Sequence, residues 1–148
     1  ATGRSAPEVM ATANWCDMPG TDEDLVLETA IDAAPFDAVC GKRVEPGQTM
    51  RFLVTSPNGT HQLHVGALFL QLYNPWARPF TGLIPGLWLD GYEGLVVIAG
   101  VPASGWTFDI TLPPGVAQQA LRWQALMLAP NPANGLFALS DAYDFFQD

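Results

Sequence analysis

His61 and His64 are the only histidines of the sequence, and imidazole nitrogens could hold a transition metal. They stand at the start of HQLHVGALFLQLY, a run that predicts a strand over residues 61–73. A regular strand sends residues with this spacing to opposite faces, which is poor geometry for joint metal binding. We therefore expect both histidines to have structural or surface roles.

Catalysis by a nucleophile or by paired acids has little support. Ser56, Ser104 and Ser140 stand outside any GxSxG nucleophile elbow. A glycosidase needs two acids across a cleft, whereas most acids here fall near the front of the chain or at its tail. We expect a noncatalytic protein, and a secreted hydrolase is the enzymatic alternative.

The densest group of carboxylates lies in DMPGTDED, residues 17–24. Calcium binds about six to eight oxygen ligands. Asp17, Asp22 and Asp24 are therefore candidate ligands, and calcium is the one cofactor that the sequence suggests. The spacing differs from that of the EF-hand loop, and a solvated acidic loop without metal is the interpretation that we favour.

Three aromatic residues lie in or beside turns: Trp76 in YNPWARPF, and Trp88 and Tyr92 in GLWLDGY. Flat, exposed rings could stack on sugar faces, as they do in carbohydrate-binding modules built on β-sandwiches. Buried rings would instead seal the end of a sandwich or belong to an interface. We favour the seal, and glycan binding is the main rival function.

The chain has two cysteines, Cys16 and Cys40, in turn-rich surroundings and without the spacing of a metal or redox site. We expect a disulfide between them, with two buried free thiols as the alternative. Closing a loop of about 25 residues would stabilise the fold by roughly 3.5 kcal/mol in the chain-entropy model. The opening ATGRSA has the small residues that signal peptidase leaves behind, so we expect an extracellular or cell-surface protein exported by a cleaved signal peptide.

The composition is unusually apolar. Of the 148 residues, 49% are hydrophobic and 14% are charged, against about 25% charged in a typical soluble domain. The formal net charge is −9 and Lys42–Arg43 is the only basic pair, which argues against nucleic acid as a partner. The apolar runs are shorter than the roughly 18 residues of a membrane-spanning helix, so no membrane insertion is expected.

Turn residues divide the chain into short apolar runs and leave no helical stripe. The runs predict strands at residues 25–31, 48–55, 61–73, 87–90, 95–99, 106–112, 120–128 and 136–146. We expect an all-β fold, a single antiparallel β-sandwich of about seven to nine strands, jelly-roll or immunoglobulin-like. A small barrel is the second choice.

The predicted strands are of two kinds. QTMRFLVT and WTFDITL alternate, with Met50, Phe52 and Val54 on one face of the first. VGALFLQLY, GLVVIAGV and LRWQALML are apolar on both faces, whereas a sandwich of this size normally exposes one face of each sheet to water. Something must cover the second face of these strands.

Residues 1–14 contain no core-forming run, so we expect an extended N-terminal arm followed by a β-sandwich domain over residues 15–148. Apolar and polar residues alternate in SAPEVMATANW, and the apolar set is Pro7, Val9, Ala11, Ala13 and Trp15. The segment could be a first strand of its own domain, a disordered tail, or an arm that adds a strand to a neighbouring subunit. An added strand would cover apolar surface on that neighbour.

The run LRWQALMLAPNPANGLFALSDAYDF resembles the closing hairpin of secreted β-sandwich proteins of planctomycetes, myxobacteria and related bacteria. In that hairpin a strand carrying Gln-Ala-Leu is followed by a Pro/Asn/Gly turn and a strand ending in Ser-Asn or Ser-Asp. The resemblance covers about 25 residues, and the matching ones are Gln124, Ala125, Leu126, Asn134, Gly135, Leu136, Ser140 and Asp141. It implies an exported, noncatalytic surface protein. Gln124, a polar residue in an apolar strand, must find hydrogen-bond partners if it is buried.

Taken together, these features predict a secreted structural protein that self-associates into a homo-oligomer or polymer, with a filament built by strand addition as one form. The alternative is a carbohydrate-binding module that uses Trp76, Trp88 and Tyr92. The second alternative is a secreted hydrolase.

Overall fold

A computed structural model describes residues 18–74, 84–114, 119–130, 132 and 137–147 of the chain. These residues form the strands β1 (Val26–Ile31), β2 (Lys42–Arg43), β3 (Thr49–Thr55), β4 (Val65–Tyr73), β5 (Gly94–Ala99), β6 (Trp106–Thr111), β7 (Ala120–Met127), β8 (Ala138–Leu139) and β9 (Tyr143–Phe146). The expected all-β fold is confirmed. None of the described residues belongs to a helix that is long and apolar enough to span a membrane.

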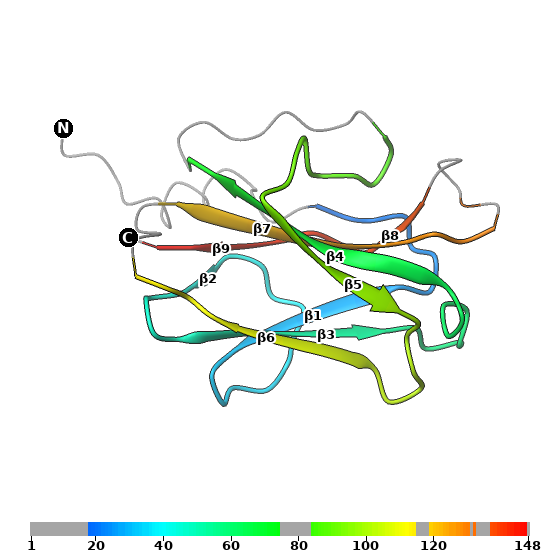
Figure 1. Cartoon of the computed structure of the whole chain (residues 1–148), viewed down its shortest axis with the longest axis horizontal. Helices are drawn as coiled ribbons and strands as arrows, with labels where there is room; N and C mark the ends of the chain where they lie inside the picture. Colours follow the sequence, from blue (N-terminus) through cyan, green and yellow to red (C-terminus); the bar gives the residue numbers. More distant parts are fainter. Residues whose placement is uncertain (1–17, 75–83, 115–118, 131, 133–136, 148) are drawn as a thin grey trace.

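The strands form two sheets, which Figure 1 shows as two layers. One has the order β1-β3-β6, and the other has the order β2-β9-β7-β4-β5 with β8 paired to β7. All pairs are antiparallel except β2 with β9, so the expectation of a purely antiparallel architecture was wrong at this edge. β2 is a short piece of the long connection between β1 and β3, and no tight hairpin turn constrains its direction.

The core lies between the two sheets. On β3 the side chains of Met50, Phe52 and Val54 are almost completely buried, as the alternation in the sequence predicted. The Phe52 ring lies 4.3 Å from the Trp123 ring of β7 and 5.7 Å from the Phe145 ring of β9, centroid to centroid. These ring contacts join the sheets face to face.

Most of the predicted strands correspond to observed ones, but the short strand β2 was not predicted, and three of the predicted strands need correction. Residues 61–64 form turns that precede β4, and residues 87–90 form no strand. The predicted strand at 136–146 is interrupted between β8 and β9. At the interruption the backbone amide of Ser140 donates to the Ala125 carbonyl and that of Ala142 to the Met18 carbonyl, so these amides bond to two different segments.

The protein's own chain covers the second face of β7 and β9. In Figure 1, residues 18–25 and 84–92 run over the six-stranded sheet on the side away from the three-stranded sheet. We call these two stretches the covering segments. The Thr21 amide donates to the Leu139 carbonyl at 2.9 Å. A Cβ on Gly20 would lie only 2.2 Å from that carbonyl oxygen, so the close approach of this segment requires glycine.

Candidate functional site

A buried ion pair lies on the covered outer face of the six-stranded sheet. Arg122 donates through Nε to Asp144 Oδ1 at 2.7 Å and through Nη2 to Oδ2 at 3.0 Å, and both side chains are fully buried. The Tyr73 hydroxyl donates to the same carboxylate at 2.5 Å. Burial alone would lower the pKa of Arg122, but the bonds to Asp144 raise it above its ordinary value.

Gln124 holds the covering segment of residues 84–92 onto β7. Its Oε1 accepts the Trp88 amide at 3.0 Å, and its Nε2 donates to the carbonyls of Gly86 and Ser140 at 2.6 and 2.8 Å. The expectation that a buried Gln124 must find partners is confirmed, since its side chain is completely buried. Among the residues of the C-terminal resemblance, Ser140 also accepts the Ala125 amide on its hydroxyl at 2.9 Å. These contacts hold the fold together and leave little of either side chain for a ligand.

Two of the three candidate aromatic residues, Trp88 and Tyr92, differ in exposure and in contacts. Trp88 is half-buried, and its indole N–H donates to the Pro19 carbonyl at 2.7 Å, so it joins the two covering segments. Tyr92 is 59% exposed, and its ring stands edge-on against the Phe69 ring at 5.2 Å. Trp76 lies outside the described residues.

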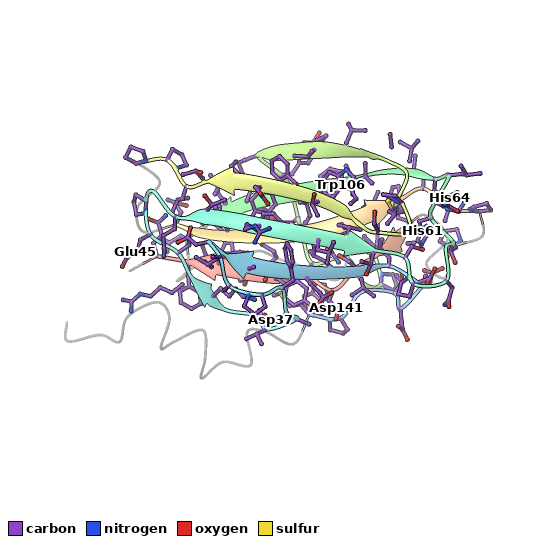
Figure 2. The ribbon with its side chains drawn as sticks, turned by 90° about the horizontal axis from the view of Figure 1, so that it is seen from below. Asp37, Glu45, His61, His64, Trp106 and Asp141 are labelled. Carbon is purple, nitrogen blue, oxygen red and sulfur yellow. The ribbon has the colours of Figure 1, made fainter. Side chains whose placement is uncertain are left out.

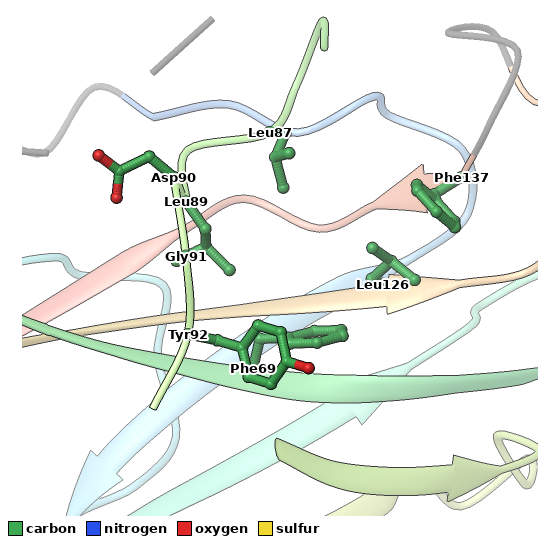
Figure 3. Close-up of a pocket in the computed structure, with 8 residues that line it drawn as sticks. All are labelled: Phe69, Leu87, Leu89, Asp90, Gly91, Tyr92, Leu126 and Phe137. Atoms are coloured by element: carbon green, nitrogen blue, oxygen red, sulfur yellow. The ribbon is translucent and has the colours of Figure 1, made fainter. Parts of the chain in front are cut away.

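Tyr92 also lines an apolar pocket between the covering segment and the sheet. Figure 3 shows the side chains of Leu87, Leu89 and Tyr92 from the segment near Phe69 of β4, Leu126 of β7 and Phe137. The pocket has a volume of about 310 Å³. The Asp90 carboxylate at its border accepts a hydrogen bond from Gln71, so it already takes part in the fold.

Among the described residues, the core is open between the edge strands β5 and β6. Each of these strands pairs with one neighbour only among the described strands. Cavities of about 150 and 130 Å³ lie between the sheets here, and both are lined by Leu70, Ile110 and Trp123. Trp106, labelled in Figure 2, is half-buried, as are Phe108 and Ile110, although the sequence pattern places all three on the inner face of β6. We call this region the open side.

An exposed apolar patch continues from the open side over β4 and β5. Leu95 and Val97 on β5 are 44% and 61% exposed, and Val65 on β4 is 51% exposed. In the register of the two strands Val97 lies opposite Ala67 and Leu95 opposite Phe69, which places these side chains on one face. The covering segments therefore shield β7 and β9, and the apolar surplus of the sequence comes to the surface at β5.

Asp24 organises the turn that follows β3. Its Oδ2 accepts hydrogen bonds from the Ser56 hydroxyl at 2.7 Å and the Thr60 amide at 3.1 Å, and its Oδ1 accepts the Asn58 amide at 2.9 Å. Burial would raise the pKa of this carboxyl, but the three partners together hold it well below its ordinary value.

Of the three candidate calcium ligands, Asp24 thus bonds to backbone and hydroxyl donors in this structure, Asp22 is exposed, and Asp17 lies outside the described residues. No group of three or more His, Cys, Asp or Glu side chains suited to a metal occurs in the described part of the chain. Calcium binding stays a prediction.

The two histidines lie together, contrary to the expectation from a regular strand. His61 and His64 sit on consecutive turns at one end of the molecule (Figure 2), and their Nδ1 atoms are 3.1 Å apart. The turns change the relative direction of the two side chains, which strand periodicity could not anticipate. His61 is buried, and His64 is partly exposed.

Two further predictions fall partly or wholly outside the described residues. Cys40 is half-buried against the core, but Cys16 is not described, so the disulfide stays a prediction. The arm residues Pro7, Val9, Ala11, Ala13 and Trp15 lie outside the described part of the chain as well. No family model, curated protein or solved structure matches this chain.

Proposed function

We propose that the protein is a noncatalytic structural subunit that self-associates outside the cell, by adding an extended strand of one copy to the open side of another. The observation that carries this proposal is the apolar opening into the core between two edge strands, β5 and β6. Edge strands offer unpaired backbone groups to an added strand, and side chains of that strand can enter pockets beside it.

The N-terminal segment is the donor that we propose. Its apolar positions from Pro7 to Ala13 alternate and carry small side chains, which suits the two small cavities of the open side. Contact between one arm and a groove on the next copy is heterologous, so it gives an open filament unless the rotation between copies closes a ring.

Two other features belong to this proposal. We propose that the two sheets form a sandwich of the jelly-roll or immunoglobulin-like type, an architecture in which edge strands flank the core. We also propose export, which the pair of cysteines supports, because disulfides persist in oxidising compartments.

The test is the size of the protein by light scattering, with negative-stain microscopy, for the full chain and for a chain lacking residues 1–14. We expect regular polymers from the full chain and folded monomers from the shortened one. A polymer from both would place the contact on the sheet faces instead of the arm. A monomer from both would end the assembly proposal.

A pair of matched variants locates the accepting edge. Val97→Lys places a charge on the exposed face of β5 and should prevent assembly while the subunit stays folded. Val26→Lys places the same charge on β1 and should leave assembly intact, because β1 is the edge of the three-stranded sheet that lies away from β6 and the open side. Equal effects of the two substitutions would mean that charge alone, and no specific edge, controls association.

Glycan binding has weaker support. Trp88 is half-buried and its indole N–H already bonds to the Pro19 carbonyl, so that of the two described candidates Tyr92 alone exposes its ring for stacking on a sugar. A monomer that binds a glycan array and loses binding in Tyr92→Ala would favour that alternative.

A further inference from the structure

We propose that His61 and His64 form a binding site for one divalent transition-metal ion, with Zn²⁺ as its representative. This inference is independent of the assembly proposal, because it concerns the end of the molecule where β3 leads into β4 (Figure 2). It rests on the distance between two ring nitrogens, on the partner of a third ring nitrogen, and on the rigidity of the turn that carries them.

The separation of the nitrogens matches a chelate. His61 Nδ1 and His64 Nδ1 lie 3.1 Å apart. Zinc binds imidazole nitrogen at about 2.0–2.1 Å in tetrahedral geometry, so two nitrogens on one ion at angles of about 90–110° are about 2.9–3.4 Å apart. The rings need only small adjustments to bind an ion placed beside the line that joins the two atoms.

The other nitrogen of His61 has the partner that metal-binding histidines usually have. His61 Nε2 lies 2.8 Å from the Glu23 carbonyl oxygen. A carbonyl can only accept, so Nε2 carries the proton and Nδ1 of the neutral ring presents a lone pair toward His64. A hydrogen bond from the second ring nitrogen to a carbonyl orients the ring of a ligand and selects its tautomer.

Several contacts hold the His61 turn in place. The His61 amide donates to the Ser56 hydroxyl oxygen at 3.1 Å, and Ser56 in turn donates to Asp24. On the other side the Val101 amide donates to the His61 carbonyl at 3.0 Å. A ligand held by such a network loses little freedom when it binds a metal, which favours affinity.

In this proposal, water completes the shell of an ion held by the two imidazoles, since the described residues contain no cluster of three or more protein ligands. His64 is partly exposed, and the neighbouring Leu63 is 93% exposed, so an ion has a path to the site. The acidic residues Asp22 and Glu23 in the adjoining loop favour a cation.

Without metal, the two rings share a hydrogen bond. His64 Nδ1–H donates to His61 Nδ1 once the proton of His61 is on Nε2. Metal binding requires that the proton of the neutral His64 ring move from Nδ1 to Nε2, so that the Nδ1 lone pairs of both histidines can bind the ion.

The experiment uses the full chain labelled with ¹⁵N in histidine and freed of metal, titrated with ZnCl₂ alone. We expect saturation at one equivalent, with the Nδ1 resonances of both histidines shifting to metal-bound positions. His64→Ala should weaken zinc binding at least tenfold. The control Leu63→Ala changes the exposed neighbour and should leave the affinity as it is.

His64 is the residue to replace because His61 is buried and supports the turn. The NMR titration of the unchanged protein keeps the proposal testable even if the His64 variant folds poorly. If zinc leaves the Nδ1 resonances of both histidines unshifted, the proposal is overturned. This includes the case in which zinc binds to the cysteine thiols instead. Unchanged affinity in a folded His64→Ala protein would overturn it as well.

Discussion

At the scale of single residues, the buried side chains of Arg122 and Asp144 hold β7 and β9 together by pairing with each other. Arg122 bonds to both carboxylate oxygens of Asp144 and donates through Nη1 to the Trp88 carbonyl at 2.9 Å. Removing one partner from a buried pair leaves an uncompensated charge, which costs far more than the pair gains over an apolar replacement. Loss of either Arg122 or Asp144 should therefore destabilise the contact between β7 and β9.

We expect Asp144→Asn to lower the free energy of unfolding by about 3–5 kcal/mol, because Arg122 then stays charged in the interior without its partner. Denaturant unfolding measures the loss. Asp37→Asn is the matched control, since Asp37 pairs with Lys42 at 2.6 Å but its side chain is 47% exposed. That change should cost less than about 1 kcal/mol, and similar losses in both variants would contradict the argument.

Asp24 predicts an acid-sensitive component of stability. The pKa of its carboxyl is depressed in the folded state, so its contribution is fully present above the ordinary value of 3.8 and is lost as the pH falls toward the folded pKa. Between pH 7 and pH 3 the wild type should therefore lose more unfolding free energy than Asp24→Asn does. Urea unfolding of both proteins at the two pH values measures this difference, and parallel losses would show that Asp24 is not responsible.

At the scale of elements, the covering segment of residues 84–92 explains how a sheet can be apolar on both faces in a small domain. This segment contains no strand. Its backbone instead forms hydrogen bonds with side chains of the sheet. For example, the Asp90 amide donates to Gln71 Oε1 at 3.2 Å. Polar residues in otherwise apolar strands thus supply the partners that a strand would have found in a ladder.

Gln124→Ala should release the segment from β7. We expect a loss of about 1–3 kcal/mol in unfolding free energy, since the Trp88 amide and the Gly86 carbonyl lose their partner. Amide hydrogen exchange at Trp88 should accelerate more than exchange in β3. Gln48→Ala is the control at a partly exposed residue beside the turn that precedes β3, where a change of about 0.5 kcal/mol or less is expected. Unchanged exchange at Trp88 would mean that other contacts hold the segment.

At the scale of the whole molecule, the composition sets two opposing forces on association. The net charge of −9 makes copies repel one another, whereas the exposed patch at β5 favours contact between apolar surfaces. The balance depends on salt, because the screening length falls from about 30 Å at 0.01 M to about 10 Å at 0.1 M ionic strength.

If assembly proceeds through the open side, raising the ionic strength from 0.01 to 0.15 M should increase the assembled fraction. Light scattering at constant protein concentration measures it, and Val97→Lys should stay monomeric at both ionic strengths. Assembly that weakens as salt rises would point to a charge-driven contact and would contradict an apolar one.

The fold class and most strands could be predicted from the amino-acid pattern, because alternation with period two directly reports the burial of one face, as in Met50, Phe52 and Val54. The sequence also indicated that a buried Gln124 needs partners, although it could not name them. The partners, Gly86, Trp88 and Ser140, come from segments up to 38 residues away. Local pattern carries no information on such distant contacts.

Which apolar faces the chain covers itself could not be predicted from the sequence and follows from the three-dimensional packing. Periodicity detects that β5 and β7 are apolar on both sides, but the covering of β7 and the exposure of β5 depend on where residues 18–25 and 84–92 cross the sheet. The same reason applies to His61 and His64, whose rings meet because turns replace the expected strand. Strand periodicity places side chains only where the backbone is extended, and the meeting of distant segments follows from packing in three dimensions.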